Sequence, residues 1–135
     1  METIKITGVE KPVVAAESIL QHSSFTKVCL NHTVFNDVAM AFVQIINADL
    51  SNMEIDGAQL GGAYIHNVGM PPEGHPAYDP QSKHAPLKFE CCDLVGTVFT
   101  DCKLNQVSII DCDLQGMKID GILVTEMLKR FKDDL

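Results

Sequence analysis

A bulky apolar residue recurs at every fifth position over most of this chain, and this rhythm constrains the fold more than any other feature. We call these residues the centres. Their spacing is unbroken within two stretches that are separated by an interruption. The centres are Phe25, Leu30, Phe35, Met40, Ile45, Leu50, Ile55, Leu60 and Ile65, then Phe89, Leu94, Phe99, Leu104, Ile109, Leu114 and Ile119. Because only 46% of the residues are apolar, an unbroken series of this length indicates a real structural repeat.

A second set of residues, mostly small or β-branched, lies two positions before the centres, as at Val43, Ala48 and Cys92. A spacing of two puts both side chains on the same face of an extended segment. The next such pair begins three positions later, so the chain must turn once per unit to keep this face inward. A helix does not fit, because five residues advance about 140° around a helix and the centres would spiral over its surface.

The two residues after most centres have the composition of exposed turns. They include Asn31-His32, Asn36-Asp37, Ser51-Asn52, Asp56-Gly57, Gly61-Gly62, Val95-Gly96, Thr100-Asp101, Asn105-Gln106, Gln115-Gly116 and Asp120-Gly121. We call these turns the corners. A chain that turns in the same sense at a fixed interval winds into a solenoid, and extended sides make that solenoid a β-helix. The sequence therefore predicts an all-β fold.

Three units, 48–52, 92–96 and 112–116, resemble the Ala-(Asp/Asn)-Leu-X-X consensus of the pentapeptide-repeat family. The resemblance covers residues 23–68 and 87–121. It implies a right-handed quadrilateral β-helix with four pentapeptides per coil, and hence about four coils. If the interruption is a bulge, Phe89 takes the place that a uniform rhythm gives to residue 70. The same count stacks Cys92 above Cys112, where a disulfide is conceivable but two small buried thiols are the favoured interpretation.

We expect one domain over residues 1–135, with segments that close or interrupt the repeats. Residues 1–22 are predicted to be an N-terminal cap, with a short helix between Val13 and Gln21. Residues 122–135 are predicted to form a C-terminal helix with Thr125 as its N-cap. Its apolar face either caps the last coil or forms a homodimer, and contains Leu123, Met127, Leu128 and Phe131. Residues 69–86 hold five of the six prolines and are predicted to be an extended loop insertion.

This loop supplies the first candidates for partner binding, His75, Tyr78 and His84, since long loops on rigid scaffolds often carry function. The alternative is a tolerated insertion without a role. Phe42 and Tyr64 are further candidates, because the repeat turns both side chains toward solvent, where apolar groups that gather mark contact surfaces. Scattered single exposures are the alternative there. A metal site at His66, His75 and His84 rests on spacing alone, and a solvated loop is favoured.

No catalytic motif is present, so we expect no enzymatic activity, no cofactor and no metal. A formal charge of −8 with scattered Lys and Arg argues against direct binding to nucleic acid. No apolar stretch is long enough to span a membrane, and the N-terminal residues lack a signal-peptide pattern, so we expect a cytoplasmic protein. The five cysteines form no metal-binding or disulfide pattern.

These observations favour a non-enzymatic protein-interaction or scaffolding module whose protein partner is unknown. The alternative comes from the resemblance: some pentapeptide-repeat proteins mimic DNA and inhibit or protect DNA gyrase. The acidity of the chain fits this alternative. Its length does not, because about four coils at about 4.8 Å each span only about 20 Å.

Overall fold

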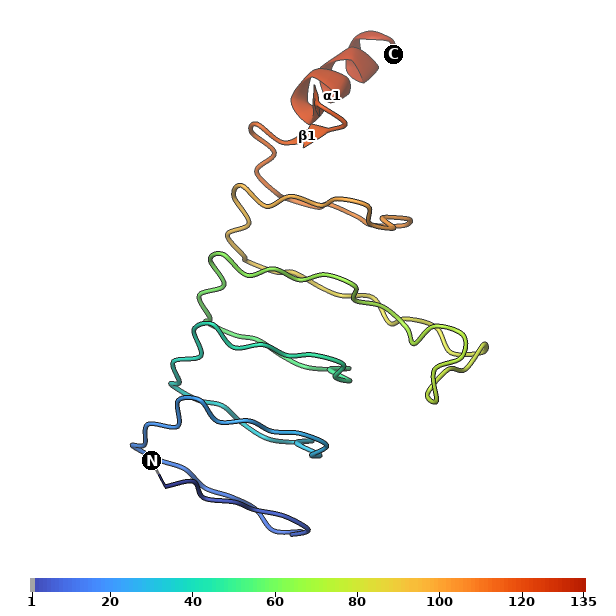
Figure 1. The fold of residues 1–135 in the computed structure, drawn as a ribbon. Coiled ribbons are helices and arrows are strands. Elements are labelled where there is room, and N and C mark those ends of the chain that lie inside the picture. Colours follow the sequence, from blue (N-terminus) through green and yellow to red (C-terminus); the bar gives the residue numbers. More distant parts are fainter. Residues whose placement is uncertain (1) are drawn as a thin grey trace. The chain divides into compact units, whose positions relative to one another are not determined.

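The computed structural model describes residues 2–135, which divide into two compact units, one up to Gly61 and the other Gly62–Leu135. Regular secondary structure lies near the end of the second unit (Figure 1). It consists of strand β1 (Lys118–Ile119), strand β2 (Ile122–Leu123) and helix α1 (Val124–Asp133). Within the described residues, no helix has the length and apolar character needed to cross a membrane.

The corners are visible in the backbone as a left-handed residue at every fifth position. Positive φ angles recur from Glu17 to Asn67 and again from Cys91 to Gly121, at the second residue after a centre or after the position that continues the series; Asp120, the first residue after Ile119, also has a positive φ. Glycine adopts this conformation freely, and Asn and Asp tolerate it better than other residues do. The predicted corners are therefore confirmed, and the rhythm starts at Glu17, earlier than predicted.

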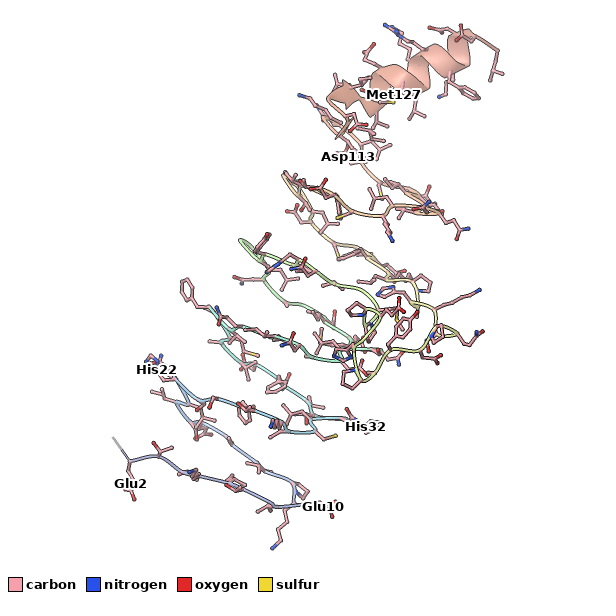
Figure 2. All side chains as sticks on the ribbon, turned by 45° about the vertical axis from the view of Figure 1, so that its right-hand side comes forward. Glu2, Glu10, His22, His32, Asp113 and Met127 are labelled. Atoms are coloured by element: carbon pink, nitrogen blue, oxygen red, sulfur yellow. The ribbon has the colours of Figure 1, made fainter. Side chains whose placement is uncertain are left out.

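The corners are of two kinds, which alternate along the chain. After Leu30, Leu50, Leu94 and Leu104, among others, the carbonyl oxygen of the centre accepts a hydrogen bond from the N–H three residues later. After the centres that lie between these, the chain makes a bend. We call the two kinds turn units and bend units. His22 and His32 each follow a turn-unit centre, and Figure 2 shows them at successive reversals of the chain.

The side chains on either side of a centre meet each other, which shows that they share one face. Three pairs show this: Asp49 Oδ1 to Ser51 Oγ at 2.6 Å, Tyr64 stacked on His66, and the ion pair of Lys88 with Glu90. Neighbours one residue apart on an extended segment point away from the residue between them. The centres therefore face the opposite side, as the spacing predicts.

The Asp that precedes Leu in the family-like units has a local structural role. Its carboxylate accepts a hydrogen bond from the backbone N–H two residues later and so holds the chain across the centre, which is an Asx turn. The bonds join Asp49 to Ser51, Asp93 to Val95 and Asp113 to Gln115, at 3.0, 3.1 and 3.0 Å. A side-chain acceptor at this position favours the corner that follows it.

The predicted β-helix requires a ladder of backbone hydrogen bonds between successive coils. Residues 2–135 do not show this ladder. Over residues 2–135, β1 and β2 form the one sheet, and no side chain is buried. Centres are half-exposed, as Leu94 is at 43%, whereas its outward neighbour Val95 is 94% exposed. The hydrogen bonds at the corners join residues that are two or three positions apart. Pairing one coil with the next joins residues that are twenty positions apart, and bringing them together costs loop-closure entropy.

Two local predictions at the ends of the chain are wrong. The segment from Val13 to Gln21 is not helical, because the corners at Glu17 and His22 continue the repeat through it. Helix α1 is present, but Leu123 is its N-cap and makes no side-chain cap hydrogen bond, so Thr125 lies within the first turn. The expected charges are in place, with Glu126 in the first turn and basic residues in the last, which suits the helix dipole.

A hairpin ends the repeat immediately before α1. Asp120 and Gly121 both have positive φ, at 48° and 81°, which is the conformation of the tight turns that reverse a chain between paired strands. Ile119 pairs with Ile122 across this turn. The N–H of Val124 then donates to the carbonyl oxygen of Met117 at 3.0 Å. The corner predicted at 120–121 is thus a full reversal that carries the chain into the helix.

Candidate functional site

The loop at 69–86 is folded locally, and His75 organises its first half. The N–H of His75 donates to the carbonyl oxygen of Pro72 at 3.0 Å, and the carbonyl oxygen of His75 accepts from the N–H of Tyr78 at 2.9 Å. The ring of His75 also takes part, since Nδ1 accepts a hydrogen bond from the N–H of Ala77 at 3.0 Å. A neutral imidazole that accepts at Nδ1 carries its proton on Nε2, which leaves Nε2 as a donor.

Asp79 organises the second half of the loop. Its carboxylate accepts from the N–H of Gln81 at 2.9 Å and from the hydroxyl of Ser82 at 2.8 Å. These hydrogen bonds lower the pKa of the Asp79 carboxyl below its usual value, and the bond from the Gln81 N–H has a larger effect than the bond from the Ser82 hydroxyl. The loop is therefore a succession of turns, and not the extended segment that its prolines predicted. Asp followed by Pro is a turn signal, which could have indicated this.

The structure joins two of the three loop candidates. His75 and Tyr78 belong to one hydrogen-bonded turn, whereas His84 lies in the sequence after the turn at Asp79 and is exposed. Tyr78 is 42% exposed, so about half of its surface is available for contact.

Tyr64 is exposed and forms an aromatic pair with His66, with ring centroids 4.2 Å apart and an angle of 14° between the rings. The side chain of Asn67 contacts the pair, since its amide nitrogen lies 3.1 Å from His66 Nδ1. Sequence reasoning selected Tyr64 but did not select His66 as its partner. The positions before and after a centre share a face, and this rule would have identified the pair.

Phe42, in the first unit, places a large apolar side chain at a corner position; Lys27, Cys91 and Gln106 also carry a Cβ at such a position. The φ of Phe42 is 61° and its side chain is fully exposed. Equivalent positions are held by residues such as His32, Asn52 and Gly62. A bulky aromatic residue in the left-handed region is an outlier, because its Cβ crowds the backbone.

The side chains that could support chemistry are dispersed. Within residues 2–135, no group of three His, Cys, Asp or Glu side chains forms a metal-binding arrangement. The five cysteines are free and exposed. Three of the thiols donate a hydrogen bond to the carbonyl oxygen two residues earlier, at 3.2 to 3.3 Å. They belong to Cys92, Cys102 and Cys112, each two positions before the centre of a turn unit. The candidate site is thus a set of exposed aromatic and imidazole groups on local turns, which suits binding.

Comparison with protein-family models gives a match to the model described as "Pentapeptide repeats (8 copies)". The model matches residues 88–116, a segment with a corner at every fifth residue from Cys91 to Gly116. Neither the curated proteins nor the solved structures contain a match to this chain. Pentapeptide repeats are therefore detected at residues 88–116, within the part of the chain that the resemblance covers.

Proposed function

We propose that this chain is a non-enzymatic protein-interaction or scaffolding module built as a right-handed quadrilateral β-helix. Support for the coil comes from the apolar centres, which remain about half-exposed along the local turns. Proteins seldom leave so many large apolar side chains exposed to water. Stacking of successive coils covers these side chains, and each square ångström of apolar surface removed from water contributes about 25 cal/mol.

The observation that most supports a binding function is Phe42. Its left-handed backbone costs about 1–2 kcal/mol for a residue with a Cβ, and its fully exposed ring offsets none of this through burial. Strained residues concentrate at functional sites. An exposed aromatic ring is also the side chain that most often anchors protein partners.

The second unit offers similar groups on defined turns. Tyr64 and His66 present a stacked pair, and the loop turn holds His75 and Tyr78. Groups that are already ordered lose less conformational entropy on binding. A protein partner that contacts aromatic and imidazole groups is consistent with these features, and no reaction chemistry is required of them.

Phe42→Asn provides the test, because Asn removes the ring and tolerates positive φ. Affinity pull-downs from the source cell would be quantified for the wild-type protein, for Phe42→Asn and for the loop variant His75→Ala/Tyr78→Ala. We expect at least a tenfold loss of the captured partner with Phe42→Asn and an unchanged or higher melting temperature. Asp37→Asn, at the preceding corner, is the matched control and should retain the partner. A lowered melting temperature with retained capture would mean that Phe42 is structural, and would contradict the proposal.

A further inference from the structure

We infer that Met70 is an additional centre, so that residues 68–72 form a pentapeptide unit and the insertion is confined to residues 73–86. This inference rests on the coil proposed above. It corrects the stacking expected from the sequence, in which Phe89 takes the place of residue 70. The first argument is the alternation of turn units and bend units.

The alternation is strict on both sides of the insertion but fails across it. The unit of Leu60 ends in a turn at Gly61-Gly62, and the unit of Ile65 ends in a bend at Asn67. The unit of Phe89 also ends in a bend, at Cys91, and the unit of Leu94 ends in a turn. Two bend units thus follow each other if nothing lies between Ile65 and Phe89. One turn unit between them restores the alternation.

The sequence directly after Ile65 supplies the missing unit. Met70 comes five residues later, and the β-branched Val68 lies two positions before it. Met70 is 44% exposed, which equals the exposure of Met40 and Leu50, both centres of turn units. Pro71 is partly buried, unlike every other residue between Gly69 and Pro86. Residues 68–72 therefore have the pattern and the exposure of a turn unit.

Pro72 explains why the repeat is interrupted at this point. It occupies the corner position of the unit, where the neighbouring corners Asn67 and Cys91 have φ of 55° and 54°. The proline ring fixes φ near −65°, so Pro72 cannot adopt the left-handed conformation. The chain then leaves the coil and turns through His75 and Asp79 before the repeat resumes at Leu87. The insertion therefore replaces one corner.

The corrected count changes which side chains surround the Tyr64–His66 pair in the second unit. With four pentapeptides per coil and Met70 counted, the unit of Ile65 is followed one coil later by the unit of Phe99. Val98 and Thr100 then stack beside Tyr64 and His66. Without Met70, the neighbours would be Lys103 and Asn105. The inferred surface around the pair is therefore uncharged.

Two deletions that both preserve the five-residue rhythm separate these alternatives. Deletion of residues 73–86, with Pro71→Asn and Pro72→Gly to provide an Asn-Gly corner, joins the Met70 unit to Leu87. Deletion of residues 68–86 joins Asn67 to Leu87 and removes the Met70 unit. For the first variant we expect a cooperative melt with a melting temperature within about 5 °C of that of the wild type. For the second variant we expect either a loss of cooperativity or a much lower melting temperature. The reverse order would overturn the inference.

Point variants of the intact chain give an independent measurement. Met70→Asp should lower the melting temperature about as much as Leu104→Asp, because both place a carboxylate among apolar neighbours. Ala77→Asp, in the loop, should change it little. If Leu104→Asp is destabilising and Met70→Asp is not, the inference about Met70 is wrong while the coil stands. If neither change is destabilising, the coil itself is wrong, and the inference falls with it.

Discussion

Single residues specify the corners of this chain through two kinds of local chemistry. The second corner residue adopts a left-handed backbone, which Gly accepts without strain and Asn or Asp with little. In the family-like units, an Asp before the centre holds the approach to the corner by accepting a backbone N–H. The contribution of each residue can be measured separately, because neighbouring positions provide matched controls.

Gly62→Ala should lower the free energy of unfolding by about 1 kcal/mol, because a Cβ at its φ of 77° is strained. Gly61→Ala is the matched control, since Gly61 does not have a positive φ and should be unchanged or slightly stabilised. No atom lies within 4 Å of the added Cβ at either position, so packing clashes do not complicate the comparison. Urea denaturation gives both values. Equal destabilisation of the two variants would contradict the assigned corner.

The pKa of Asp49 is lowered, chiefly by the hydroxyl of Ser51 and then by the Ser51 N–H. Because the folded pKa lies below the unfolded value of about 3.9, these bonds stabilise the fold above that pH, and their contribution is lost as the pH falls through the folded pKa. An NMR titration of the Asp49 carboxyl should therefore show a midpoint below that of an Asp in an unfolded peptide. Ser51→Ala should move the midpoint back upward without restoring it fully, since the backbone bond remains. An unchanged midpoint would exclude the hydroxyl as the main cause.

At the scale of elements, the hairpin and α1 end the repeat and cover part of its last unit. Met117, Val124 and Met127 are among the few partly buried residues of residues 2–135. Val124, Met127, Leu128 and Phe131 follow helical spacing and form one apolar stripe on α1. Leu128 and Phe131, in the second half of this stripe, remain 48% and 65% exposed. The chain thus partly covers Val124 and Met127 at the start of the stripe and leaves Leu128 and Phe131 at its end exposed to solvent.

We expect a second copy of the chain to cover Leu128 and Phe131, so that the protein dimerises through α1. Light scattering coupled to size-exclusion chromatography should give a dimer mass that decreases on dilution. The double change Leu128→Glu/Phe131→Glu should give a monomer, while Lys129→Glu/Lys132→Glu, outside the stripe, should leave the dimer intact. A monomeric wild-type protein at about 100 μM would show that no such dimer of functional strength forms.

At the scale of the whole chain, the sequence predicted what is encoded within five residues and was less informative about what depends on context. The corners and the C-terminal helix are confirmed, because each has a local signal, whereas the burial of the centres inside a coil stays a prediction. The helix predicted from Val13 to Gln21 is wrong, because the corners at Glu17 and His22 continue the repeat through this segment. The prolines of the loop predict an extended segment, whereas hydrogen bonds at His75 and Asp79 fold it into turns. Phe42 and Tyr64 are exposed, and their role in partner binding stays a prediction. Finding the Tyr64–His66 stack requires the rule that the two neighbours of a centre share one face.

The overall charge raises the DNA-mimic alternative, which can be tested directly. Residues 23–68 and 87–121 carry ten acidic and four basic side chains, so the repeats are acidic like a duplex. The proposed solenoid has fewer than five coils even with Met70 included, and at about 4.8 Å per coil it spans at most about 24 Å. One turn of duplex spans about 34 Å, so the charged surface is too short to replace a longer DNA segment. We therefore expect no inhibition of gyrase in a supercoiling assay at 10 μM protein. Inhibition at that concentration that weakens as salt is added would indicate electrostatic competition with DNA, and the DNA-mimic function would then replace the scaffolding proposal.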